Sequence, residues 1–141
     1  MADNKSGYPR ADIRWHVVVT SDERTLEGVT SKVTPNGVFI HCQQPLRLNE
    51  VFEMDISIPG SEKSLKARAE VIWSNRYGPD DHISPRGMAV RFLRITSEAR
   101  KFIARATLDY LKSKEVPPEL LQTLSTLMID LEEVKSKVAH S

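Results

Sequence analysis

The strongest constraint on the fold is a series of short extended runs between residues 13 and 92, most of which alternate apolar and polar side chains. Alternation at period two places the apolar side chains on one face of a β-strand. The predicted strands cover residues 13–19, 26–34, 38–42, 52–58, 65–73 and 87–92. Because no helix-length segment separates them, the pattern predicts an all-β core, a six-stranded antiparallel barrel, and excludes a parallel α/β sheet.

Some runs also predict which side chains face the core. The first points four apolar side chains to one face: Ile13, Trp15, Val17 and Val19. The fifth does the same with Leu65, Ala67, Ala69, Val71 and Trp73, and the sixth with Met88, Val90 and Phe92. Between the second and third runs, Pro35-Asn36-Gly37 predicts a hairpin turn, since Asn and Gly accept positive φ and proline fixes its own backbone angle.

After residue 95 the period changes to that of a helix. Thr96 and Ser97 are suitable N-caps, and Glu98 suits the first turn. Apolar residues then recur three and four positions apart, which predicts an amphipathic helix packed on the barrel through Phe102, Ile103, Ala106, Tyr110 and Leu111. Val116-Pro117-Pro118 predicts a hinge at its end, because proline interrupts helical hydrogen bonding.

The last segment carries a heptad seam. Its members are separated by 4, 3, 4, 3 and 4 residues: Leu120, Leu124, Leu127, Leu131, Val134 and Val138. One interpretation is an extra helix that covers part of the domain's own core. The other, which we favour from the sequence, is a coiled coil that makes the protein a homo-oligomer, because a helix about 30 Å long exceeds so small a barrel. The predicted organisation is a flexible segment at 1–12, a barrel with its closing helix at 13–113 and a heptad helix at 117–140.

Composition narrows the class of function. The 20 Lys and Arg residues against 19 Asp and Glu leave a net charge of +1, so nothing predicts a DNA partner. A single cysteine, an N-terminus without a secretory apolar region and the lack of any apolar stretch of about 20 residues predict a cytoplasmic protein without membrane insertion.

The sequence predicts no enzyme and no metal site. Its four histidines are scattered, and no His or Cys pair has metal-ligand spacing. Phosphate-binding glycine loops and the nucleophile-elbow pattern are missing as well. We therefore interpret the chain as non-catalytic and without a cofactor.

One constellation suggests a ligand. Two arginines, Arg10 and Arg14, precede the first predicted strand, and the first hairpin carries Lys32, Thr34, Asn36 and Gly37. Guanidinium groups bind phosphate oxygens bidentately and stack on purines, and a glycine lets backbone approach a ligand. In a barrel these residues would form one surface pocket. The simpler alternative is that both arginines are solvated residues beside a strand.

Four segments in order resemble the PilZ domain. They are residues 8–13, 32–40, 69–73 (Ala-Glu-Val-Ile-Trp) and 87–92 (Gly-Met-Ala-Val-Arg-Phe), and the resemblance covers about residues 8–111. It implies a six-stranded antiparallel barrel and, in many members, binding of the bacterial second messenger cyclic di-GMP.

Binding members of that family carry RxxxR before the first strand and [DN]xSxxG at the hairpin. Arg10 and Arg14 have the spacing of the two motif arginines. The apolar alternation that follows Arg10 also resembles the alternation after the second arginine of the motif, and in that register Ser6 stands at the position of the first arginine. The hairpin motif is Lys32-x-Thr34-x-x-Gly37. Threonine keeps the hydroxyl, whereas lysine has no acceptor for a guanine edge, a loss of about 1–3 kcal/mol in binding.

The resemblance therefore leaves two functions open. The first is a cyclic di-GMP receptor in which the nucleotide joins the N-terminal segment to the barrel and presents a new surface. The second is a nucleotide-independent PilZ adaptor that contacts protein partners in type IV pilus, motility or envelope regulation.

Overall fold

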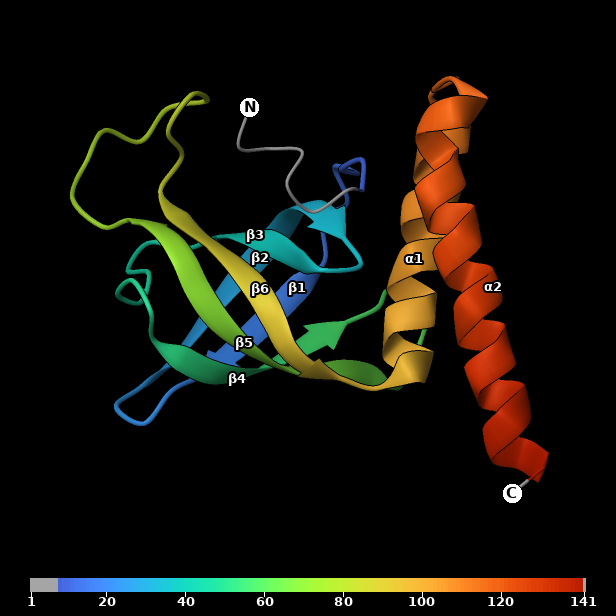
Figure 1. Cartoon of the computed structure of the whole chain (residues 1–141). Coiled ribbons are helices and arrows are strands. Elements are labelled where there is room, and N and C mark those ends of the chain that lie inside the picture. The colour runs from blue at the N-terminus through green and yellow to red at the C-terminus, as the bar shows by residue number, and fades with distance from the viewer. Residues whose placement is uncertain (1–7, 141) are drawn as a thin grey trace.

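A computed structural model describes the backbone of residues 8–140 and the side chains of residues 8–132. It contains a closed antiparallel barrel with the strand order β1-β2-β3-β6-β5-β4 (Figure 1), which confirms the predicted fold class. The strands are β1 (His16–Thr20), β2 (Thr25–Thr34), β3 (Gly37–His41), β4 (Val51–Ser57), β5 (Ser64–Asn75) and β6 (Gly87–Ile95). Two helices follow, α1 (Ser97–Ser113) and α2 (Pro118–His140).

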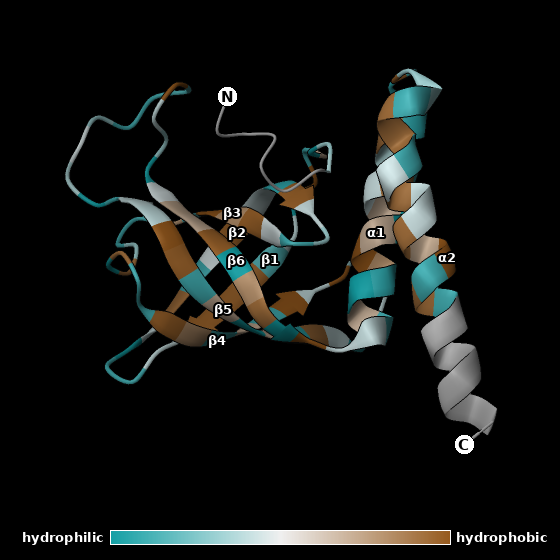
Figure 2. Ribbon diagram, viewed as in Figure 1, coloured by the Kyte–Doolittle hydropathy of each residue, from teal (hydrophilic) through white to brown (hydrophobic). Residues whose placement is uncertain are grey.

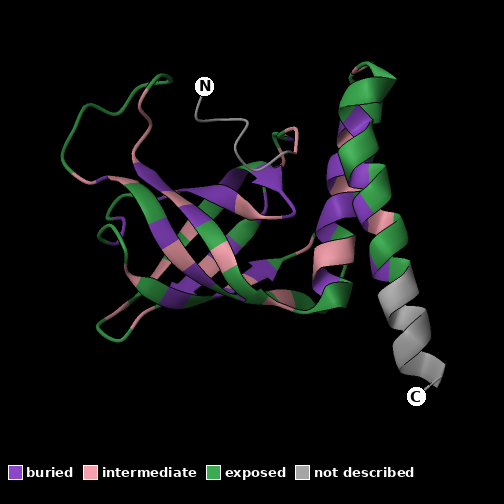
Figure 3. Cartoon of the chain, in the orientation of Figure 1, coloured by how far each residue is buried: buried purple, intermediate pink, exposed green. Residues whose placement is uncertain are grey.

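The core fills the inside of the barrel, because side chains that alternate along the regular parts of the strands point inward. Val17, Val19 and Ile56 are fully buried there, beside Val71 and Met88. Figures 2 and 3 show the same alternation as bands of apolar and buried residues across the strands. Burial of apolar surface is the main stabilising term, at roughly 25 cal/mol per Å².

The first strand begins later than predicted, at His16 instead of residue 13. The side chain of Thr30 on β2 is the cause. Its Oγ1 accepts from the backbone N–H of Trp15 at 3.0 Å and donates to the carbonyl of Ile13 at 2.8 Å. The hydroxyl thus takes the place of some backbone bonds before β1, while the N–H of Thr30 still donates to the carbonyl of Trp15 at 2.9 Å. Trp15 enters the core as predicted.

The inward orientation predicted for Trp73 is wrong. The pairing of β5 with β6 shifts register between Val71 and Trp73, so Ile72 is the extra residue of a bulge. A bulge reverses the alternation that follows it. Trp73 is accordingly 43% exposed on the outside of the barrel.

Helix α1 begins as predicted, since Oγ1 of Thr96 accepts from the N–H of Ala99 at 3.1 Å. Its buried face is wider than expected, because α1 packs against β2 on one side and α2 on the other. Ala104, Thr107 and Leu108 are buried, in addition to the predicted Ile103 and Leu111. Phe102, predicted to face the barrel, is 42% exposed at the edge of this face.

Helix α2 lies antiparallel along α1 at the side of the barrel (Figure 1). Its seam residues Leu124, Leu127 and Leu131 are buried in clusters shared with α1, whereas Leu120 is 54% exposed. Val134 and Val138 lie outside the described side chains. The seam is therefore used within the chain, as in the first of the two sequence interpretations, and self-association stays a prediction.

Part of the segment predicted to be flexible is held in place. Ala11 is fully buried and exchanges two backbone hydrogen bonds with Val33 of β2, at 3.0 and 2.7 Å. Tyr8 packs against the apolar clusters of α1 and α2. Residues 1–7 lie outside the described part of the chain. Across residues 8–140, neither helix combines the length and apolar character needed to cross a membrane.

Candidate functional site

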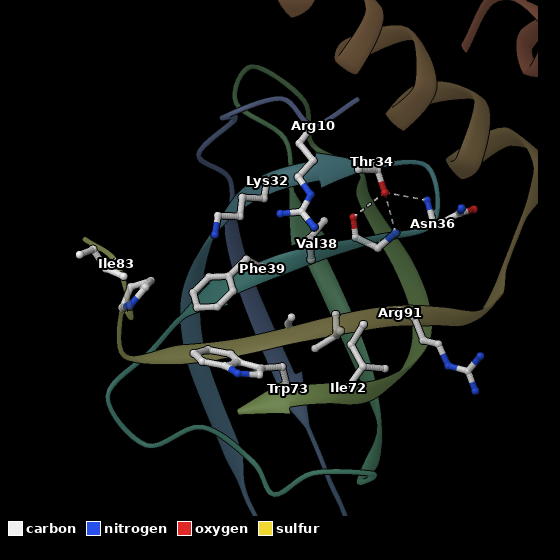
Figure 4. Close-up of a pocket in the computed structure, with 14 residues that line it drawn as sticks. Arg10, Lys32, Thr34, Asn36, Val38, Phe39, Ile72, Trp73, Ile83 and Arg91 are labelled. Atoms are coloured by element: carbon white, nitrogen blue, oxygen red, sulfur yellow. Dashed lines mark hydrogen bonds between the residues drawn. The ribbon is translucent and has the colours of Figure 1, made fainter. Parts of the chain in front are cut away.

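A pocket of about 650 Å³ lies on the outer face of the barrel, over β2, β3, β6 and the end of β5 (Figure 4). Five of the six residues predicted to bind a ligand line it: Arg10, Lys32, Thr34, Asn36 and Gly37. The chain thus brings the N-terminal segment and the first hairpin to one surface, as the constellation predicted.

Arg14 is not part of this pocket. Its Nε lies 2.9 Å from Oδ1 of Asp12, and both side chains are more than half exposed. Residues four apart lie close together in a helix, whereas in an extended segment they are about 13 Å apart along the chain, so Arg14 lies too far from Arg10 to line the same pocket. Position 6, the other candidate for a second arginine site, lies outside the described residues.

Thr34 shapes the turn. Its Oγ1 accepts from the N–H groups of Asn36 and Gly37, at 3.1 and 3.2 Å, and donates to the carbonyl of Gly37 at 3.2 Å (Figure 4). A hydroxyl that caps its own turn in this way stabilises local backbone geometry. The hydroxyl thus has a structural role in the turn, and its predicted contact with a ligand stays a prediction.

Asn36 links the pocket to α1. Its Oδ1 accepts from Nη2 of Arg100 at 2.9 Å, and its carbonyl accepts from the N–H of Phe92 at 2.8 Å. The side chain consequently points from the turn toward the helix (Figure 4). Any ligand that displaces this turn would also displace a contact of α1.

Lys32 occupies an unusual backbone conformation, with φ of 50° at a register shift in β2. Left-handed backbone costs a residue with a Cβ about 1 kcal/mol or more, and Asn and Asp tolerate it better than Lys. The shift directs the side chain over the pocket, where Nζ lies 5.5 Å from the centre of the Phe39 ring.

Sequence reasoning missed the aromatic part of the site. The rings of Phe39 and Trp73 lie 5.9 Å apart at 43°, and Ile72, Ile83 and other apolar residues continue this wall. Phe39 could have been found, because it alternates with the core residues Val38 and Ile40 and so points outward. Trp73 is harder to find, because the apolar run Val71-Ile72-Trp73 breaks the alternation at the bulge but does not show which of the three side chains points outward.

Small residues on β6 make room for these rings. A Cβ on Gly87 would lie 2.2 Å from the carbonyl oxygen of Ile40 and 2.8 Å from Cε1 of Phe39, and Ala89 pairs with Phe39. Gly37 is equally constrained, since a Cβ there would lie 2.1 Å from the carbonyl oxygen of Val90. The hollow thus depends on glycine where β3 and β6 approach each other.

The electrostatic character of the pocket is positive. Arg10, Lys32 and Arg91 line it, and none of its described lining residues has a carboxylate. Arg91 is held by Glu70, with Nη2 2.7 Å from Oε1. A surface that combines cationic and aromatic side chains suits an anion that carries flat rings.

His41 and Ser31 form a hydrogen-bonded pair beside the pocket. Nε2 of His41 is 2.8 Å from Oγ of Ser31. The rings of His41 and Phe39 meet edge to face, with their centres 4.8 Å apart. Burial lowers the pKa of His41, and the positive charges of Arg14 and Lys32 add to this, although Asp12 opposes them. A neutral imidazole is therefore favoured near neutral pH.

The described residues offer no metal centre. Between residues 8 and 132, no three His, Cys, Asp or Glu side chains are grouped closely enough to hold an ion. Burial raises the pKa of the Cys42 thiol to about 11, which keeps it protonated in the core.

Comparison with known proteins now supplies the family. The model of a family described as "PilZ domain" matches residues 4–109, whereas no curated protein matches. Among solved structures, the chain is similar to the Bacillus subtilis inhibitor of motility (MotI/DgrA), with 17% identity and a TM-score of 0.62. That match covers 76% of this chain and 51% of the other, so the chain spans about half the length of that protein.

Two further solved structures are similar. The PilZ domain with c-di-GMP of YcgR from Escherichia coli is 13% identical, with a TM-score of 0.54 and coverage of 75% of this chain and 89% of that one. The PilZ domain of CeSA from a cellulose-synthesizing bacterium is 14% identical, with a TM-score of 0.49 and coverage of 71% and 95%. The family match extends over most of the chain and agrees with the closed barrel described above. The chain therefore belongs to the PilZ domain family.

Proposed function

We propose that this protein is a non-catalytic signalling module that binds cyclic di-GMP in the pocket over β2, β3 and β6. One observation carries the proposal. Two cationic side chains, Arg10 and Lys32, line a pocket that also has an aromatic wall and no carboxylate, at the hairpin that resembles the family's binding motif. A cyclic dinucleotide has the matching parts, two phosphates and two purines.

The cations take the phosphates. The Arg10 guanidinium supplies a planar fork for two phosphate oxygens, and the Lys32 ammonium adds a point charge beside it. Charge-assisted hydrogen bonds such as those of the Arg10 fork contribute about 1.5–3 kcal/mol each. The exposed Lys32 ammonium is screened by solvent and contributes less than about 1 kcal/mol. Because the dianion meets no carboxylate among the described lining residues, these contacts are not offset by repulsion.

The aromatic wall takes a guanine. Trp73 offers the exposed ring face, while Phe39 is 5% exposed and supports it from below. Stacking of a base on an aromatic side chain is worth about 1–3 kcal/mol. Ile83 and Pro85, from the loop between β5 and β6, close the same side of the pocket.

The N-terminal segment connects the pocket to the helices. Arg10 lines the pocket, Ala11 is fixed on β2, and Tyr8 packs against the clusters of α1 and α2. A nucleotide that immobilises Arg10 would also restrain Tyr8, only two residues away. The response to ligand is therefore a change in how the helix pair is held, which a protein partner can detect.

A nucleotide-independent adaptor is the second candidate, and Lys32 favours it. This residue stands where the family motif has an acceptor for guanine, and its ammonium has only donors. The adaptor would contact partners through its barrel surface and helices, in pilus, motility or envelope regulation. The relative named as an inhibitor of motility is consistent with such a setting.

Calorimetric titration with cyclic di-GMP at physiological salt separates the two candidates. For the receptor we expect saturable binding that weakens at least about tenfold in both Arg10→Ala and Trp73→Ala, given the contact energies above. Arg47→Ala is the matched control, since Arg47 is an exposed arginine outside this pocket. Absence of heat at high micromolar nucleotide with the wild-type protein would eliminate the receptor and leave the adaptor.

A further inference from the structure

A second hollow, of about 640 Å³, lies between the first half of α1 and the β4–β5 hairpin. Its apolar residues are Ile58 and Leu65 from the hairpin and Ala99 and Phe102 from α1. This hollow is separate from the pocket over β2, β3 and β6, because the two share no lining residue. The sequence patterns did not predict it. We call it the helix groove.

Phe102 gives the helix groove its apolar anchor point. One side of the ring rests on the buried Trp15, with the ring centres 6.2 Å apart, and 42% of the residue remains exposed. The ring is thus fixed by the core while part of it stays open to solvent. A large aromatic side chain held this way is typical of a contact residue at a protein interface.

The charge around the helix groove is mainly positive. Lys63, Lys66, Lys101 and Arg105 line it, against one carboxylate, Glu98. Lys66 pairs with Asp55, and Lys101 pairs with Glu132 of α2. Lys63 and Arg105 are both exposed, and within the described side chains neither has an ion-pair partner.

We propose that the helix groove binds an acidic segment of a partner protein that inserts an apolar side chain beside Phe102. The two unpaired cations lie on different elements, Lys63 on the hairpin and Arg105 on α1, so carboxylates on either side of an apolar anchor can meet both. Opposite charges at the rim steer the encounter, and the buried anchor supplies most of the affinity.

The shape of the site favours a peptide over a lipid surface. A membrane is bound by side chains that protrude together from a convex face, whereas these cations flank a hollow that also contains Glu98. A peptide can insert a single side chain into such a hollow, whereas the flat surface of a bilayer cannot.

The test uses the full-length chain and a defined probe. The probe is a short synthetic peptide in which Glu and Asp residues flank a central Phe-Leu pair. Two control peptides replace every acidic residue with Lys, or the Phe-Leu pair with Ser-Ser. Binding is followed by backbone amide shifts of the isotopically labelled protein, which locate the contact residue by residue.

We expect the acidic peptide to shift amides around Lys63, Leu65 and Phe102, and both control peptides to bind at least about tenfold more weakly. Arg105→Glu and Lys63→Glu should each weaken the acidic peptide by about tenfold, because a like charge at the rim repels it. Arg47→Glu, a charge reversal outside the helix groove, should bind as the wild type does. All three sites are exposed, so the fold is retained.

Three results would overturn the proposal. One is equal binding of the acidic and basic peptides, or shifts elsewhere on the surface. Another is sedimentation with phosphatidylglycerol vesicles that depends on Arg105 while the peptide fails to bind, which would assign the groove to lipid. The third is a dimer in light scattering that Arg105→Glu dissociates, which would assign it to a second copy of the chain.

Discussion

At the scale of single residues, Lys32 concentrates the difference between this chain and the family's binding motif. Its backbone lies at φ of 50°, a conformation that Asn adopts with less strain, and its side chain lacks an acceptor. Lys32 thus differs from the residue of the family motif in two ways, in its backbone preference and in its hydrogen bonding.

Replacing this lysine tests both effects. In Lys32→Asn we expect cyclic di-GMP affinity to rise about tenfold, because an amide oxygen can accept a hydrogen bond from a guanine edge. The binding free energy gained by this bond exceeds the binding free energy lost with the lysine charge. The free energy of unfolding should rise by up to about 1 kcal/mol through relief of left-handed backbone strain. Calorimetry and urea denaturation measure the two quantities. Lys63→Asn, on an exposed loop, is the control, and weaker binding in Lys32→Asn would show that the charge matters more than the acceptor.

His41 makes stability depend on pH. Its folded-state pKa lies below the usual 6.5, so the unfolded chain takes up a proton more readily than the folded one. The contribution of His41 to the free energy of unfolding is therefore complete above about pH 6.5, and it is lost as the pH falls through the folded-state pKa.

We expect the free energy of unfolding of the wild type to fall more between about pH 7.5 and about pH 5 than that of His41→Gln. Glutamine can still bond to Ser31 but does not titrate, so the difference between the two curves isolates this histidine. His82→Gln, in the exposed loop after β5, should follow the wild type. Parallel curves for all three proteins would contradict the assignment.

At the scale of elements, the local signals in the sequence predicted what local chemistry determines. Pro35-Asn36-Gly37 predicted the turn between β2 and β3, and Thr96 predicted the start of α1. What failed depends on contacts between segments distant in sequence. The direction of Trp73 is set by a bulge against β6, and the start of β1 by the hydroxyl of Thr30.

The heptad seam shows the same limit. A stripe of leucines indicates that a helix has an apolar face. It does not indicate whether α1 of the same chain or α2 of a second chain covers that face. In the structure α1 provides the cover, because its residues Ala104, Leu108 and Leu111 complete the clusters. A homo-oligomer that used Leu124, Leu127 and Leu131 would first have to separate α2 from α1.

Paired substitutions on α2 measure this contact. Leu124 is fully buried, so Leu124→Ala should lower the free energy of unfolding by about 2–4 kcal/mol through lost burial and a cavity. Ile129, on the same helix, is 60% exposed, and Ile129→Ala should change it by less than about 0.5 kcal/mol. Urea denaturation of both variants gives the comparison. The packing of α2 on α1 would be refuted by equal effects, or by a larger effect at Ile129.

At the scale of the whole molecule, α1 connects the two sites. Arg100 holds Asn36 at the edge of the pocket over β2, β3 and β6, and Phe102 and Arg105 line the helix groove. The N-terminal segment adds a second connection, from Arg10 in the pocket to Tyr8 on the helix clusters. These two contacts are the routes by which the proposed nucleotide would act on the helices.

Amide hydrogen exchange tests the connection through Tyr8. If cyclic di-GMP restrains the N-terminal segment, amides of α2 should exchange more slowly when the nucleotide is bound, by up to about a hundredfold at about 100 times its Kd. Tyr8→Ala removes the contact with the helices but leaves Arg10 in place, so it should keep most of the nucleotide affinity and lose most of the protection of α2. Tyr77→Ala, at an 85% exposed position, controls for removal of a tyrosine. Equal protection of α2 in the wild type and in Tyr8→Ala would place the coupling elsewhere, and the remaining route is the hydrogen bond between Asn36 and Arg100, which Arg100→Ala removes.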